Sequence, residues 1–193
     1  MSKRILLLLA ILTLSLAASA TTVDMQFNAP VGGDYNGVST YPYDVSVNGQ
    51  SQWLMCVSYN EHVTGGETWQ ATVGSIVGTH DEQLAWLFLQ AEQNSDFGVK
   101  ADINAAAWFL NEGTPDLDQA AQFWYNQAIS QNFTDGEFQN VVKYVPIDGT
   151  QSWQGETPQE FFGDAPVPEP STLMMLGTGV IGVAGILRRN LNA

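Results

Sequence analysis

Cysteine is almost absent from this 193-residue sequence, in which Cys56 is the single example. One cysteine excludes an internal disulfide, so the folded part must be stabilised by packing and hydrogen bonds. Basic residues are scarce too, with six Lys and Arg against 20 Asp and Glu. Four of these six lie at the two ends, which leaves only Lys100 and Lys143 in the acidic middle. Such a surface repels phosphate, so the sequence predicts no binding to nucleic acid.

The N-terminus has three parts, in the order typical of a secretory signal peptide. Lys3 and Arg4 form a short basic region, residues 5–16 form an apolar run, and residues 18–20 (Ala-Ser-Ala) are a small-residue cleavage site. The apolar run is shorter than the ~20 residues that a transmembrane helix needs. We therefore expect residues 1–20 to be a signal peptide and the remainder of the chain to be exported.

The C-terminus consists of a proline-containing strip, an apolar stretch and two arginines. The prolines disfavour a helix and leave the strip at 164–171 extended, as a stalk. Residues 172–187 would span about 24 Å as a helix, which is slightly short for a permanent anchor. The arginines favour a cytoplasmic location for the tail at 188–193. The sequence thus predicts a stalk, a transmembrane helix and a basic cytoplasmic tail.

This tripartite end resembles the PEP-CTERM sorting signal. The residues that carry the resemblance are Val167, Pro168, Glu169, Pro170, Ser171, Arg188 and Arg189. It implies an exosortase as partner, a membrane protease that cuts near Pro-Glu-Pro and releases or attaches the protein at the surface. It also implies the inner membrane and, as a further partner, exopolysaccharide. Such tails are also called ice-binding protein C-termini, but the sequence has no regular Thr-rich repeat that would order ice.

Residues 21–163 are predicted to form a single acidic α+β domain outside the cytoplasm, with antiparallel strands followed by about three helices and a final strand. Its first firm element is a hairpin, because Asn48-Gly49 is a strong two-residue turn signal. A capping box at 79–82 opens the first helix, Gly113 ends the second and Thr114-Pro115 opens the third. The expected elements are an irregular stretch with one edge strand at 21–40, strands at 43–47, 52–59, 68–73 and 138–147, helices at about 79–94, 100–111 and 114–131, and a short helical turn at 157–162.

Two stretches of the middle domain resemble the paired signatures of bacterial surface thioester domains. Cys56 lies in a predicted strand, Trp-Leu-Met-Cys-Val-Ser-Tyr, and Asn104 lies in a predicted helix, Ile-Asn-Ala-Ala-Ala-Trp. In that family a strand cysteine and a helix glutamine form an internal thioester that acylates a host or matrix nucleophile. Here Asn104 stands at the glutamine position, one methylene shorter, and Ser58 replaces an aspartate. Two other interpretations of Cys56 are a small buried hydrophobe and a nucleophile paired with His62 or His80.

The tryptophans suggest a second kind of site. Trp86, Trp108 and Trp124 fall on predicted helices among apolar residues, so they are expected to pack in the core. Trp69 and Trp153 are expected at the surface. Exposed rings there would stack on sugars and bind glycans.

Neither a metal nor a cofactor is predicted. Asp116 and Asp118 are expected to cap a helix, because their stretch lacks the glycine and the distal glutamate of a calcium loop. Residues 177–182 match the dinucleotide-binding pattern G-x-G-x-x-G, but no strand precedes them and small residues are ordinary in a membrane segment.

The sequence as a whole predicts an exported cell-surface or extracellular-matrix protein that is sorted by its tail and is not an enzyme. An adhesive or glycan-binding surface module is the alternative. A thioester protein or a cysteine-dependent enzyme is the third. No catalytic residue is assigned.

Overall fold

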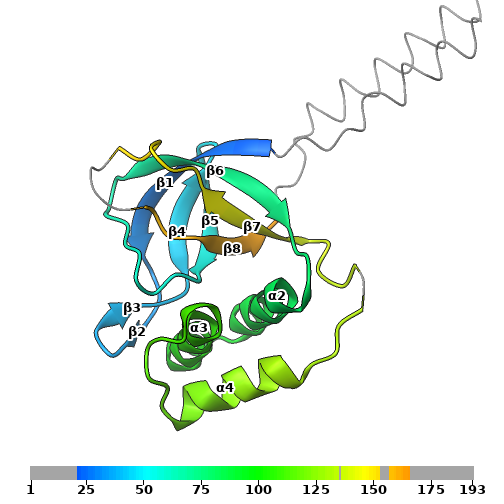
Figure 1. The fold of residues 1–193 in the computed structure, drawn as a ribbon. Helices are drawn as coiled ribbons and strands as arrows, with labels where there is room; N and C mark the ends of the chain where they lie inside the picture. Colours follow the sequence, from blue (N-terminus) through cyan, green and yellow to red (C-terminus); the bar gives the residue numbers. More distant parts are fainter. Residues whose placement is uncertain (1–20, 135, 153–156, 166–193) are drawn as a thin grey trace, which may run out of the picture.

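The computed structural model describes residues 21–134, 136–152 and 157–165. Over these residues the chain forms eight strands and three helices in one domain (Figure 1). The predicted signal peptide, transmembrane segment and basic tail lie outside the described residues. No helix in the described ranges is long and apolar enough to span a bilayer.

Six of the described strands close into an antiparallel barrel, in the order β1-β4-β5-β8-β7-β6. Their bounds are β1 Thr21–Pro30, β4 Tyr43–Val47, β5 Gln50–Cys56, β6 Thr68–Ser75, β7 Val141–Pro146 and β8 Phe161–Asp164. A separate small hairpin consists of β2 (Asp34–Tyr35) and β3 (Val38–Ser39). Closure of the barrel pairs both edges of every strand in it, which removes the edges that would otherwise invite pairing with another chain.

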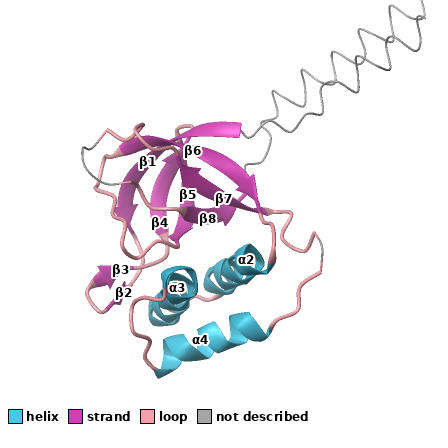
Figure 2. Cartoon of the chain, in the orientation of Figure 1, coloured by secondary structure: helices cyan, strands magenta, loops and turns pink. Residues whose placement is uncertain are grey.

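The three helices form one layer beside the barrel. They are α2 (Thr79–Gln93), α3 (Phe97–Glu112) and α4 (Gln119–Ser130), and all are inserted between β6 and β7. Figure 2 shows them gathered below one end of the barrel, with α2 and α3 nearer to it than α4. We call these three helices the helical layer.

Two hydrophobic cores meet at the end of strand β5 and at Val57, the residue that follows it. Leu54 and Cys56 belong to the core inside the barrel, whereas Met55 and Val57 belong to the core between the barrel and the helical layer. Successive side chains of a strand point to opposite faces, and here both faces are covered. All four residues are therefore fully buried, without the usual alternation of apolar and polar positions.

Several sequence predictions about local structure are confirmed. Asn48 and Gly49 have φ angles of 50° and 80° and connect β4 to β5, as a two-residue hairpin turn requires. Gly113 ends α3 in the left-handed conformation, with its N–H donated to the carbonyl of Phe109 at 2.8 Å. Antiparallel strands precede three helices, and strand structure follows them, in the predicted order.

Two predictions about strands are wrong. The stretch 21–40, expected to be irregular with one edge strand, begins with the ten-residue strand β1, which pairs with β4 on one side and β6 on the other. The helical turn expected at 157–162 is replaced by β8, which starts at Phe161 and pairs with β5 and β7. Both strands complete the barrel, and their partners lie far away in the sequence.

The predicted capping of α2 and the predicted start of α4 are wrong as well, although α2 begins at Thr79 as predicted. Gly78 is the N-cap of α2 and gives no side-chain hydrogen bond, so the capping box at 79–82 does not form. The third helix starts at Gln119 rather than at Thr114-Pro115, because Asp118 caps it through bonds to the N–H groups of Ala120 and Ala121. That capping role for Asp118 is the one expected from the sequence.

Candidate functional site at the barrel–helix junction

The single cysteine lies where β5 reaches the helical layer, and it is sealed from solvent. Its side chain is fully buried, and the Sγ–H group donates a hydrogen bond to the carbonyl of Ser58 at 3.0 Å. Burial raises the pKa of Cys56 to about 12, and the hydrogen bond to Ser58 opposes this rise only in part. The thiolate is the nucleophilic form, so at neutral pH this sulfur is held as an unreactive thiol.

Asn104 reaches the same place from α3 and contacts Cys56. Its Nδ2 donates to the backbone carbonyl of Cys56 at 2.8 Å, and its Oδ1 accepts from the backbone N–H of Tyr41 at 2.7 Å. The side chain is fully buried. One amide thus ties α3 to the end of β5 and to the segment that precedes β4. We call Tyr41, Cys56, Asn104 and Trp108 the junction.

Small residues let α3 pack closely on two sides, since Ala106 and Ala107 belong to the core that contacts the barrel and Ala101 and Ala105 belong to the cluster shared with α4. Alanines occupy positions 101, 105, 106 and 107, and each is at most 3% exposed. Trp108 follows them, fully buried, with its ring edge-on to Tyr59 at a centroid distance of 5.3 Å. Its indole Nε1 has no hydrogen-bond partner within the described part of the chain.

The structure brings Cys56 and Asn104 together, as the resemblance to thioester domains predicted. Their contact, however, runs through the backbone carbonyl of Cys56, while the thiol is bonded to Ser58. Both polar atoms of the Asn104 side chain are already used. In this geometry the pair holds chain segments together.

The two histidines lie apart from the thiol. His62 is exposed, in the loop after β5, and lines a pocket of about 520 Å³ with Tyr43 and Gln159. His80 is in the first turn of α2, where its Nε2 lies 3.2 Å from Oδ1 of Asn111. Neither makes a hydrogen bond to Cys56, so the Cys-His arrangement considered from the sequence is not assembled.

The expected surface position of Trp69 is wrong. Trp69 is 3% exposed and stacks on Phe161 inside the barrel, with centroids 6.1 Å apart and an interplanar angle of 21°. Its neighbours Thr68 and Gln70 occupy the outward positions of β6, which leaves the inward position to the ring. Trp153, the other expected sugar-stacking residue, lies outside the described residues.

The helical tryptophans differ in how deeply they are buried. Trp108 is fully buried, as predicted. Trp86 and Trp124 are only partly buried, and their rings lie 6.3 Å apart where α2 meets α4. Outside the helices, Trp53 on β5 is 59% exposed, a position that the sequence reading did not single out.

Both lysines of the acidic middle have partners that the sequence reading missed. Lys143 on β7 forms an ion pair with Asp81 on α2, with Nζ 2.6 Å from Oδ2, and so links the barrel to the helical layer. Lys100 is 7% exposed, and its Nζ lies 5.1 Å from the centre of the Tyr41 ring. The sequence did offer one sign that these two lysines have specific partners, because they are the only Lys or Arg residues in the acidic middle of the chain.

In the described ranges, no group of three or more His, Cys, Asp or Glu side chains is placed to hold a metal ion.

Comparison with known proteins decides the role of the C-terminus. Residues 166–189 match the PEP-CTERM protein-sorting motif. The chain carries a PEP-CTERM sorting signal. The match includes Val167, Pro168, Glu169, Pro170, Ser171, Arg188 and Arg189, which are the residues that suggested it, although all lie outside the described residues. A PEP-CTERM signal marks an exported protein that an exosortase processes at the membrane.

Among solved structures, the folded domain is similar to the N-terminal thioester domain of a surface protein from Clostridium perfringens. The match covers 74% of this chain and 98% of that chain, at 11% sequence identity and a TM-score of 0.46. The structural similarity is weak. No curated protein matches the sequence.

Proposed function

We propose that this PEP-CTERM protein is displayed at the cell surface or in the extracellular matrix, and that its folded domain acts there as a non-catalytic module. The sorting signal supports export and processing by an exosortase. The order of parts supports display, because the folded domain lies between a predicted signal peptide and the sorting tail.

The state of Cys56 is the observation that carries the non-catalytic part of the proposal. It is the one cysteine of the chain, it is fully buried, and its pKa is raised to about 12 by that burial. A catalytic thiol needs access to substrate and a base within hydrogen-bond reach. In the described structure its hydrogen bond runs to a backbone carbonyl instead.

An internal thioester is the second candidate, favoured by the contact between Cys56 and Asn104. To form it, Sγ would attack the side-chain carbonyl carbon of Asn104, and the amide nitrogen would leave as ammonia together with the thiol proton. The exported protein would then lose about 17 Da and its free thiol. Our proposal predicts the full mass and a free thiol. Cys56→Ala is the control, because it abolishes any thioester and must show no such loss.

Sorting is tested by fractionating cells that contain an exosortase. We expect the full chain to be cut near the Pro168-Glu169-Pro170 motif and to leave the inner membrane. Pro168→Ala combined with Glu169→Ala should leave an uncut chain in the membrane fraction, whereas Ala165→Ser, which precedes the matched residues 166–189, should be processed normally. Equal release of the double variant and the wild type, or unchanged processing in cells without the exosortase, would overturn the sorting role.

A further inference from the structure

The outward side chains of three barrel strands form a polar surface around one exposed aromatic ring. This surface consists of Asn28 on β1, Asp44 and Ser46 on β4, and Ser51 and Trp53 on β5. We call these five residues the outer polar face. The helical layer covers the outward side of β5 only near Met55, so Trp53, two residues earlier, is left open.

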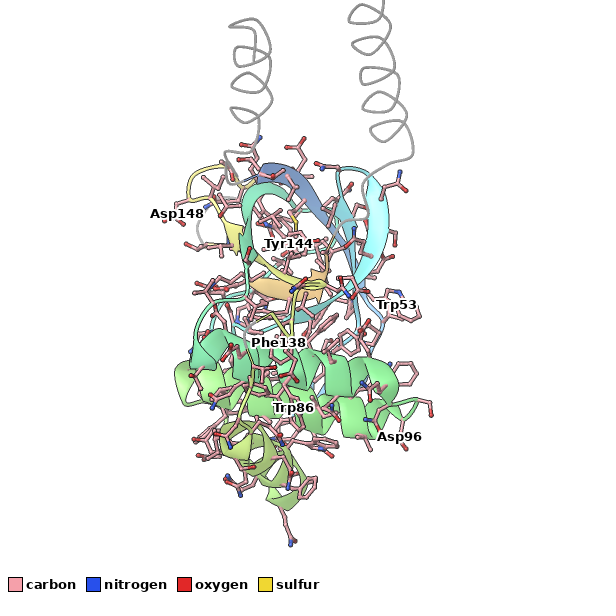
Figure 3. The ribbon with its side chains drawn as sticks, turned by 90° about the vertical axis from the view of Figure 1, so that its right-hand side faces the viewer. Trp53, Trp86, Asp96, Phe138, Tyr144 and Asp148 are labelled. Carbon is pink, nitrogen blue, oxygen red and sulfur yellow. The ribbon has the colours of Figure 1, made fainter. Side chains whose placement is uncertain are left out.

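Trp53 is the exposed ring of this face. It is 59% exposed and is paired across the strands with Asp44. Figure 3 shows its side chain projecting away from the barrel. No ring contact involves it within the described residues, unlike Trp69, Trp86 and Trp108, each of which packs against another aromatic ring.

Asp44 organises the polar residues beside that ring. Its Oδ1 accepts hydrogen bonds from Nδ2 of Asn28 at 3.0 Å and from Oγ of Ser51 at 2.5 Å. The same Nδ2 of Asn28 lies 3.0 Å from Oγ of Ser46. The other carboxylate oxygen of Asp44 and the amide oxygen of Asn28 accept no hydrogen bond from the described part of the chain. Fixed side chains with unused acceptors are what a hydroxyl-rich ligand requires.

A groove continues this face across β1 to β6. It has a volume of about 590 Å³, and it is lined by Ser46, which it shares with the outer polar face, and by Gln26, Thr68, Gln70 and Thr150. Adjacent strands are about 4.8 Å apart, so the path from β5 over β4 and β1 to β6 extends over roughly 14 Å. The groove and the face thus form one elongated polar strip with an aromatic ring near one end.

We infer that this strip binds a neutral polysaccharide, which deepens the proposed function by naming a ligand class for the surface module. The Trp53 ring would stack on the apolar C–H face of one sugar. Asp44, Asn28 and the groove would accept and donate hydrogen bonds to sugar hydroxyls along the chain. Aromatic rings combine a large apolar surface with little conformational freedom, which suits such a platform.

Charge selects neutral over anionic polymers. Asp44 lies in the strip, and Asp24 also lines the groove. The two lysines of the described residues are engaged elsewhere, Lys143 with Asp81 and Lys100 over Tyr41. An acidic polysaccharide would meet carboxylates without a compensating cation, and like charges raise its free energy of binding.

The test is co-sedimentation of the full-length chain, in detergent, with crystalline cellulose, chitin and cross-linked dextran. Dextran sulfate beads serve as the anionic counterpart of the dextran. We expect retention on at least one neutral matrix and none on dextran sulfate. Trp53→Ala should lower the affinity roughly tenfold. Phe123→Ala removes a ring that is 54% exposed on α4, away from the strip, and should bind like the wild type.

Asp44→Ala tests the polar half of the strip separately and should also weaken binding to the matrix that retains the wild type. The inference is overturned if no neutral matrix retains the chain, if Trp53→Ala binds as well as Phe123→Ala, or if dextran sulfate is the preferred matrix. Exosortase-dependent release is measured separately, by cell fractionation. A negative result in co-sedimentation would therefore overturn the ligand assignment and leave the sorting role unaffected.

Discussion

Two residues of strand β5, only three positions apart, differ completely in their exposure to solvent. Trp53 on the outer polar face is 59% exposed, whereas Cys56 at the junction, three residues later, is fully buried. Trp53 lies on the outer side of β5, which the helical layer covers only near Met55, whereas Cys56 points into the barrel core. The residue types that suggest chemistry are therefore not the ones placed to meet a ligand.

The junction and the outer polar face also differ in how many of their polar atoms are already hydrogen-bonded. At the junction both atoms of the Asn104 amide are bonded to backbone groups, and the thiol is bonded as well. On the outer polar face Asp44 and Asn28 bond to neighbours through one atom each and keep an acceptor for other molecules. Buried polar groups that are fully paired stabilise a fold, while exposed groups held in place can recognise a partner.

The largest expected effect is on thiol labelling, which compares the two regions directly. We expect Cys56 to react with a thiol reagent at least about 1,000-fold more slowly in the native chain than in guanidinium, because access requires unfolding. A double variant, Trp53→Cys with Cys56→Ala, should label at the rate of an exposed thiol. Native labelling of Cys56 within tenfold of that rate would contradict a closed junction, and no labelling in guanidinium would indicate a thioester.

The second prediction concerns the amide at the junction. Asn104→Ala leaves the N–H of Tyr41 and the carbonyl of Cys56 buried without partners. Each such group costs about 1–3 kcal/mol, so we expect a total loss of about 2–6 kcal/mol. Guanidinium unfolding followed by tryptophan fluorescence measures it. Asn126→Ala is the matched control, because Asn126 is exposed on α4 and should change stability by less than about 0.5 kcal/mol.

A pair of tryptophan variants sharpens the contrast between inside and outside. Trp69→Ala should cost about 3–5 kcal/mol in unfolding free energy, because the ring fills the barrel core against Phe161. Trp53→Ala should cost less than about 0.5 kcal/mol. If the two variants lose similar stability, then Trp53 contributes to the fold and its exposure is not reserved for binding.

The smallest expected effect is a pH dependence next to the ion pair that links β7 to α2. Burial raises the pKa of Glu160, and nearby Lys143 opposes this only in part. A carboxyl that binds its proton more tightly when folded stabilises the fold below its unfolded pKa, about 4.3, and that contribution is lost as the pH rises through the folded pKa. Glu160→Gln should therefore stabilise the protein at pH 7 more than at pH 4.

Thermal unfolding at the two pH values measures this difference. Glu82→Gln on α2 serves as the control for removal of one negative charge from the same part of an acidic protein. Equal stabilisation by Glu160→Gln at both pH values would show that burial does not control this carboxyl.

Local signals in the sequence were sufficient for several elements. Asn48-Gly49 specified its hairpin, Gly113 ended its helix, and Asp118 capped the next one, because each depends on a few neighbouring residues. The prediction failed at β1 and β8, whose partners lie far away in the sequence, 107 positions for Met55 and Phe162. Short-range propensity contains no information about such partners.

The candidate sites also differ in whether they depend on local sequence or on long-range packing. The sequence by itself determined the sorting tail, a linear pattern that acts without a fold and is matched as PEP-CTERM. The signal peptide is a linear pattern of the same kind and stays a prediction. It also paired Cys56 with Asn104. Only the tertiary structure decided what that pair does, and which tryptophan meets solvent. Closure of the barrel turned Trp69 and Cys56 inward, and the helical layer covered Met55 but stopped short of Trp53, because exposure depends on what packs over a strand.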